Sequence, residues 1–123
     1  MSAHAKIELT HPTFKLRVTV VADIAIGPGK ADLLEGIKDR GSISAAGRRM
    51  GMSYKRAWYI VDAMNGHFGK PLVEAVKGGR AGGGARLTPL GEEVLSAFRE
   101  MEKLTATAIA PALTRLRRKT APL

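Results

Sequence analysis

Residues 41–65 read GSISAAGRRMGMSYKRAWYIVDAMN, and they contain two short helical patterns that meet at Gly51. We expect a short helix that begins at Ser42 or Ser44 and ends at Gly51, followed by a longer helix that begins at Ser53. Serine favours such starts because its hydroxyl accepts a hydrogen bond from the first-turn N–H groups. Four apolar residues of the longer helix follow the i, i+3, i+4, i+7 spacing of a buried face. They are Ala57, Ile60, Val61 and Met64.

The joint between these two helices has the residue sizes of a helix-turn-helix. Ala46 and Gly47 are small and fall where the helices must approach closely, whereas Met50, Met52 and Ile60 fall where the motif needs apolar contacts. A turn of three to four residues that contains glycine is the usual connection. An ordinary helix hairpin with no role in DNA binding shares this spacing. The spacing alone therefore does not distinguish it from a DNA-binding helix-turn-helix, but the charge of the segment does favour one of the two.

Basic residues are in excess over the whole chain and in this segment. The chain has 20 Lys and Arg against 11 Asp and Glu, a net charge of +9, which favours an anionic partner such as nucleic acid. No acid lies between Arg40 and Val61. Lys55 and Arg56 fall in the first helical turn, where the helix dipole disfavours cations but where a recognition helix contacts base edges. Trp58 is expected in the core. The predicted DNA contacts, with hydroxyls directed to phosphates, are Ser53, Tyr54, Lys55, Arg56, Tyr59 and Arg48.

A glycine-rich run at 77–86, KGGRAGGGAR, lies between two strand-like segments, LVEAVK at 72–77 and ARL at 85–87. Gly79 and Gly84 have the glycine spacing of a phosphate-binding loop, but such a loop also needs Lys-Ser/Thr and a helix directly after it. The flanking strands instead predict a β-hairpin wing whose bases neutralise DNA phosphates. These bases are Lys77, Arg80 and Arg86. For the middle one, two roles stay open: contact with phosphates or entry into the minor groove.

The segments before this unit predict one strand and one helix. KLRVTVVA at 15–22 is β-branched and partly alternating, which is typical of a strand. GPG at 27–29 is expected to break the chain. KADLLEGIKDRG at 30–41 then predicts a helix that ends at Gly41, because glycine readily takes the left-handed conformation that closes a helix.

The segment after the wing predicts a long last helix. Thr88 and Pro89 are a suitable N-cap and first helical position, and Pro111 is expected to kink the helix. Its apolar residues at helical spacing include Leu90, Val94, Phe98, Met101 and Leu104. The expected organisation is a flexible arm at 1–14, a winged helix-turn-helix at 15–88, the last helix at 89–119 and a tail at 120–123. The fold class is mainly α with a small β-hairpin and an N-terminal strand.

Six motifs together resemble the DNA-binding domain of the ModE-type molybdate-responsive transcriptional regulators, which is itself similar to the LysR-type winged helix. They are GSIS at 41–44, SYKRAW at 53–58, MN at 64–65, LVE at 72–74, the glycine run, and LTPLG at 87–91. The resemblance implies a homodimer on a palindromic operator, with a dimer interface formed by the last helix and assisted by the N-terminal segment. The implied interface residues are Leu90, Val94, Phe98, Met101 and Leu104.

The resemblance also implies that the residues of the SYKR motif contact DNA from the recognition helix and that the three wing bases contact it from the hairpin. Molybdate is a possible ligand by resemblance alone, since no cofactor site is identifiable in the residues. The chain is expected to lack the oxyanion-binding C-terminal domains of the family.

Other function classes find less support in the sequence. The chain has no cysteine, which excludes disulfides and thiolate chemistry, and His4, His11 and His67 have no metal-ligand spacing. We therefore expect no enzyme. The chain has no apolar run of membrane-helix length, so we expect no membrane partner and a cytoplasmic, nucleoid-associated location. The alternative function is a non-specific architectural DNA-binding protein, which would not discriminate between DNA sequences.

Overall fold

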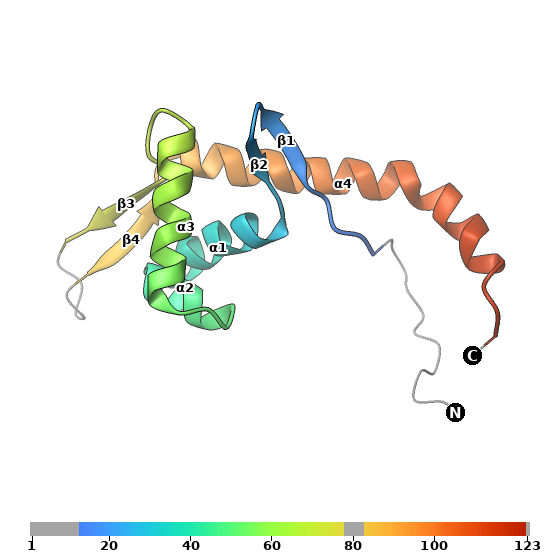
Figure 1. Cartoon of the computed structure of the whole chain (residues 1–123), viewed down its shortest axis with the longest axis horizontal. Helices are drawn as coiled ribbons and strands as arrows, with labels where there is room; N and C mark the ends of the chain where they lie inside the picture. The colour runs from blue at the N-terminus through green and yellow to red at the C-terminus, as the bar shows by residue number, and fades with distance from the viewer. Residues whose placement is uncertain (1–12, 78–82, 123) are drawn as a thin grey trace.

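The computed structural model describes residues 13–77 and 83–122. It is a winged helix-turn-helix, mostly helical, with two small antiparallel hairpins, which confirms the predicted fold class. The elements are β1 (Val18–Val21), β2 (Ile24–Ile26), α1 (Pro28–Arg40), α2 (Ile43–Arg49), α3 (Tyr54–His67), β3 (Val73–Val76), β4 (Gly84–Leu87) and α4 (Pro89–Arg118). Figure 1 shows α1, α2, α3 and the β3–β4 hairpin gathered into a compact part, here called the head, from which α4 extends far to one side.

The N-terminal strand is one half of a hairpin that the sequence did not reveal. β1 pairs antiparallel with β2, and Val18 lies opposite Ile26. The GPG segment does not break the chain as expected, since Pro28 is the first residue of α1. Proline fits there because the N–H that it lacks would have no partner in the first helical turn.

The helix-turn-helix forms as its local signals predict. The Ser42 hydroxyl accepts from the N–H of Ala45 at 3.0 Å, and the Ser53 hydroxyl accepts from the N–H of Arg56 at 3.1 Å. Gly51, in the turn between α2 and α3, has a φ of 72°, a backbone conformation that glycine takes without steric cost. The turn therefore needs glycine for conformation and serine for capping.

Small residues let the three helices approach one another closely, and the approach of α2 to α3 at Gly47 was predicted. A Cβ at Gly36 of α1 would lie 3.0 Å from the Cβ of Ala46 of α2, and one at Gly47 would lie 2.9 Å from the Cβ of Ala57 of α3. These separations leave no room for a larger side chain. The partly buried residues Met50, Met52 and Ile60 pack against the core around the same joint, as expected.

The core is formed by one face of each helix and the inner sides of the strands. Its fully buried larger side chains are Phe98, Leu33, Leu34, Ile37, Met64, Leu72 and Val61. Trp58 is absent from this core, and its side chain is 43% exposed, so the expectation that it is buried was wrong. The buried face of α3 is narrow and consists of Ala57, Val61 and Met64. Trp58 lies one residue further around the helix and faces the wing instead.

The wing, the β3–β4 hairpin, is regular and is fixed to the helices of the head at two places. Within it, Val73 lies opposite Leu87 and Val76 opposite Gly84. The N–H of Ala85 donates to the carbonyl oxygen of Gly41 at 2.8 Å, which connects β4 to the joint between α1 and α2. The end of α3 holds the start of β3 through a side-chain amide that is described with the site below.

Helix α4 belongs to the head at its beginning and leaves it further along. The Thr88 hydroxyl caps α4 by accepting from the N–H of Gly91 at 3.0 Å. Leu95 and Phe98 are buried in the core of this same chain. Phe98 has no exposed surface, so its predicted place in an interface between two chains is wrong. The helix continues through Pro111 to Arg118, and its ribbon bends towards the C-terminal end (Figure 1).

Ion pairs connect α1 to α4. Arg99 of α4 forms ion pairs with Asp32 and Glu35 of α1 at 2.8 and 2.9 Å, and with Glu102 at 3.0 Å. Burial lowers the pKa of the Arg99 guanidinium, but its hydrogen bonds to these carboxylates outweigh that effect and raise the pKa above its ordinary value. Within the described ranges, no helix combines the length and the apolar character needed to cross a membrane.

Candidate nucleic-acid interface

The first turn of α3 presents the two bases that the sequence assigned to base recognition. Lys55 and Arg56 are both exposed. Among the residues that the structure describes, neither forms an ion pair with a carboxylate, and the same holds for Arg48. The guanidinium of Arg48 instead donates to the Ser44 hydroxyl at 3.0 Å. Three cations are thus available at the helix-turn-helix joint for an anionic partner.

Three aromatic side chains extend along the outer face of α3. Tyr54 is 55% exposed and Tyr59 is 72% exposed. Both residues that were predicted to donate hydroxyl groups to phosphates are therefore at the surface. The indole N–H of Trp58 donates a hydrogen bond to the hydroxyl of Tyr54, one helical turn earlier. Two of these exposed aromatic side chains are therefore held together by a hydrogen bond.

A small cavity separates α3 from the wing. It has a volume of about 230 Å³ and is open to solvent on one side. Tyr54, Trp58 and Val61 line it from α3, while Ala75 and Gly84 line it from the wing. The cavity is mostly apolar, and Trp58 forms part of its wall. The wing and α3 thus lie on either side of one depression.

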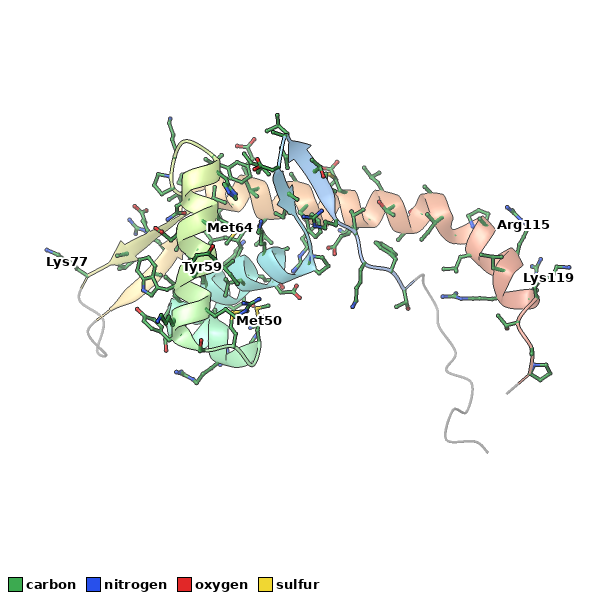
Figure 2. All side chains as sticks on the ribbon, viewed as in Figure 1. Met50, Tyr59, Met64, Lys77, Arg115 and Lys119 are labelled. Atoms are coloured by element: carbon green, nitrogen blue, oxygen red, sulfur yellow. The ribbon has the colours of Figure 1, made fainter. Side chains whose placement is uncertain are left out.

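The wing bases differ in how available they are to a partner. Lys77 is exposed and lies at the outer end of β3, directed away from the head (Figure 2). Arg86 is exposed too, but its Nε lies 3.1 Å from a carboxylate oxygen of Glu74, its cross-strand partner. Arg80 lies outside the described residues. The prediction treated Arg86 as a free base and overlooked Glu74, although the two residues are opposite each other in a hairpin of this register.

The amide of Asn65 is a site residue that sequence reasoning missed, apart from its presence in the quoted MN motif. Its Oδ1 accepts from the N–H groups of Leu72 and Val73 at 2.8 and 3.1 Å, and its Nδ2 donates to the carbonyl oxygen of Val73 at 3.1 Å. One side chain at the end of α3 thereby holds the start of β3. Its position two residues before the helix end, followed by a strand, is the only signal that the sequence offers.

Acidic side chains of α1 and α4 are paired with cations. Glu92 of α4 accepts from Lys38 of α1 at 2.8 Å, and this hydrogen bond and the charge of Glu92 raise the pKa of Lys38. Asp39 pairs with Arg49 at 3.4 Å. Together with the Arg99 ion pairs, these contacts use cations to neutralise acids on the α1–α4 side. The surface at the start of α3 keeps its positive charge as a result.

No cluster of three or more His, Asp or Glu side chains is placed to hold a metal ion in the part of the chain that the structure describes. The candidate site is therefore a basic and aromatic surface over α3 and the wing. Its described members from the prediction are Ser53, Tyr54, Lys55, Arg56, Tyr59, Arg48, Lys77 and Arg86. Trp58 and Asn65 join them from the structure.

Comparisons with known proteins agree with this fold. Residues 31–92 match the family model described as bacterial regulatory helix-turn-helix protein, lysR family. The chain is similar to the molybdenum-pterin-binding protein MopB of Rhodobacter capsulatus, with 49% identity over 77 residues, 63% of this chain and 28% of that protein. It is similar to the molybdenum transport protein ModE of Azotobacter vinelandii, with 38% identity over 96 residues, 76% of this chain and 36% of that protein.

A third relative is the DNA-binding transcriptional dual regulator ModE of Escherichia coli (strain K12), 38% identical over 86 residues, which are 70% of this chain and 31% of that protein. The resemblance to ModE-type regulators is thus confirmed. The chain spans about a third of the length of these curated relatives.

Two solved structures share the architecture. One is the crystal structure of a CbnR_DBD–DNA complex, where the match covers 72% of this chain and 95% of the CbnR chain, with a TM-score of 0.56. The identity is 19%, so this likeness concerns the fold alone. The other is the full-length LTTR LysG from Corynebacterium glutamicum with bound effector Arg, where the match covers 80% of this chain and 31% of the LysG chain, with a TM-score of 0.56 and 30% identity. The family model, the relatives and the fold lead to one assignment: the chain belongs to the lysR family of bacterial regulatory helix-turn-helix proteins.

Proposed function

We propose that this chain is the DNA-reading part of a transcriptional regulator that recognises double-stranded DNA by sequence. The start of α3 enters the major groove, and the wing contacts the adjacent backbone. The observation that carries this proposal is the separation of charge described above. Lys55 and Arg56 have no carboxylate partner among the described residues, whereas the acids on the α1–α4 side pair with their own cations. Such an arrangement directs one face of the protein towards a polyanion.

Sequence discrimination separates this proposal from non-specific architectural binding. If Lys55 contacts a base edge, Lys55→Ala costs ~1–3 kcal/mol of discrimination between the preferred site and random DNA. Lys70→Ala is a matched control, since Lys70 is exposed and lies beyond the other end of α3. Fluorescence anisotropy with both DNAs measures the effect. If wild-type protein binds both DNAs equally well, the architectural alternative is correct.

We further propose that two copies associate through α4 and bind a palindromic operator. Beyond the head, α4 carries two large apolar side chains that the described residues leave uncovered: Leu104 is 62% exposed and Leu116 is 65% exposed. Met101, one turn before Leu104, is partly buried against the core. Large exposed apolar side chains on a protruding helix favour burial against a partner. Leu90 and Val94 already pack against the core of this chain, so the proposed interface lies further along the helix than predicted.

Sedimentation equilibrium tests this association. The double variant Leu104→Glu, Leu116→Glu should be a monomer at concentrations where the wild type is a dimer, because two charges would have to be buried at the interface. Lys103→Glu, at an exposed residue next to Leu104, is the charge-changing control. Equal masses for the wild type and the double variant would contradict the proposal.

The names of the relatives mention molybdenum and molybdenum-pterin. The chain spans about a third of the length of those proteins, and we propose for it DNA binding and self-association. By resemblance, a response of the whole regulator to molybdate would change how this part engages its operator. Operator binding by the isolated chain, with and without molybdate, tests whether the response needs more than these residues: we expect the same affinity in both conditions.

A further inference from the structure

The hydrogen bond between Trp58 and Tyr54 is a feature of the α3 surface that the proposed function leaves unused. Trp58 is the only tryptophan in the chain. It is 43% exposed at the surface that we assign to DNA, although a tryptophan in a helix normally buries most of its ring. It lines the cavity between α3 and the wing.

The chemistry of the two groups determines the direction of the hydrogen bond. An indole nitrogen is only a donor, whereas a phenol hydroxyl both donates and accepts. The Tyr54 oxygen therefore accepts from Nε1 of Trp58, and the hydroxyl hydrogen of Tyr54 has to point elsewhere. Tyr54 is 55% exposed, so this hydrogen is available to an acceptor outside the protein.

The indole of Trp58 lies at the cavity between α3 and the wing. Ala75 and Gly84 of the wing line the same cavity as Trp58 and Val61 of α3. β4 is hydrogen-bonded to the α1–α2 joint through the Ala85 N–H, so the wing wall of the cavity is tied to the helices. Trp58 thus lies on the wing side of the recognition helix, hydrogen-bonded to a hydroxyl one turn earlier on the same helix.

The surroundings of Tyr54 favour an anionic acceptor. Tyr54 is the first residue of α3, directly followed by Lys55 and Arg56, and Lys77 is exposed at the outer end of β3. A hydroxyl that donates to an anion forms a stronger hydrogen bond than one that donates to a neutral acceptor. A DNA phosphate beside the major groove is the acceptor of matching charge and reach.

We propose that Trp58 is a positioning residue that holds the Tyr54 hydroxyl as a hydrogen-bond donor to a DNA phosphate. This inference rests on the proposed DNA binding and goes beyond it by assigning to Trp58 the role of orienting a hydroxyl that the sequence directed to phosphates. The phosphate contact then depends on a second residue, which acts through that hydroxyl.

A double-mutant cycle with Tyr54→Phe, Trp58→Phe and the double variant tests this inference. Each substitution removes one polar group and keeps an aromatic ring. We expect Tyr54→Phe to weaken binding about tenfold, which corresponds to about 1.4 kcal/mol, and equally for the preferred site and random DNA. Trp58→Phe should cause a smaller loss of the same kind, about threefold. The double variant should bind no more weakly than Tyr54→Phe, because the indole acts only through the hydroxyl.

The salt dependence of binding provides a readout that a general loss of structure would not reproduce. A neutral hydroxyl releases no counterion when it meets a phosphate, so the slope of log K against log salt should stay at the wild-type value in all three variants. Lysine and arginine contacts lower that slope by about one each when removed. Thermal melts of the free variants serve as the folding control, and Trp58→Leu, which also lacks a hydrogen-bond donor, replaces Trp58→Phe if the latter is unstable.

The outcomes separate the two proposals. If the wild type binds no DNA, the proposed function fails and this inference fails with it. If the wild type binds DNA but the losses of the single variants multiply in the double variant, only this inference is overturned. Unchanged affinity in the folded Trp58→Phe variant, or in the folded Trp58→Leu variant, would overturn it as well.

Discussion

Asn65 holds the wing to the recognition helix, and its removal should destabilise the whole head. Its side chain makes three hydrogen bonds to the backbone of Leu72 and Val73, at 2.8, 3.1 and 3.1 Å. Leu72 is fully buried and Val73 is 4% exposed, so water does not readily replace the lost partners. At a net ~1 kcal/mol per hydrogen bond, Asn65→Ala should lower the free energy of unfolding by ~3 kcal/mol.

Asn65→Asp is the matched control for this prediction. A carboxylate still accepts from the N–H groups of Leu72 and Val73 but no longer donates to the Val73 carbonyl oxygen. We expect this variant to lose ~1–2 kcal/mol, so that its stability lies between those of the wild type and Asn65→Ala. Urea unfolding followed by circular dichroism at 222 nm measures both values. A loss below ~0.5 kcal/mol in Asn65→Ala would refute the assignment of Asn65 as the connection between α3 and β3.

Three further substitutions test other contacts of the head. In Gly91→Ala the new Cβ would lie 2.1 Å from the Leu72 carbonyl oxygen, so α4 must shift, and thermal melts should show a loss of ~3 kcal/mol or more; a melting temperature equal to the wild type would contradict the close approach. Arg99→Met should cost ~1–2 kcal/mol in low salt and less in high salt, because partly exposed ion pairs are screened; a loss independent of salt would argue against them. Glu74→Gln releases Arg86 from its ion pair, so DNA affinity should rise and the salt slope should steepen by about one contact; unchanged binding would show that Arg86 does not face DNA.

The local signals of the sequence predicted the helices well. Ser42, Ser53 and Thr88 cap their helices through the hydroxyl contacts expected of them, and Gly41 closes α1 with a φ of 76°. These features depend on residues three or four positions apart, so a single chain segment contains all the information. Gly47 was predicted at a close approach for a related reason, since the spacing around the turn fixes which residues of the two helices meet.

Contacts between distant segments were harder to predict. Trp58 and Phe98 are both aromatic residues on helices with apolar stripes, and the sequence alone assigned each to the wrong environment. Phe98 is buried because α1 and the wing surround the start of α4, and Trp58 is exposed because the core reaches only a narrow face of α3. The Arg86–Glu74 pair likewise depends on the strand register, which the sequence left open.

The structure also distinguishes basic side chains that are paired from those that are available, whereas composition gives only their number. An excess of bases predicted a polyanionic partner, but not which bases would be available. The structure shows that Lys38, Arg49 and Arg99 are engaged by carboxylates on the α1–α4 side. Arg115 and Lys119 lie at the end of α4 far from the wing, so their charge is remote from the proposed site (Figure 2).

Selection of bound DNA from a random pool tests the central claim most directly, because it does not presuppose a site. With the wild type, we expect enrichment of two inverted half-sites whose centres are about 10 base pairs, or a multiple of that, apart. With Lys55→Ala, the same selection should lose its preference at one position in each half-site while still recovering DNA. A wild-type pool that binds yet shows no enriched sequence would contradict sequence recognition by the start of α3.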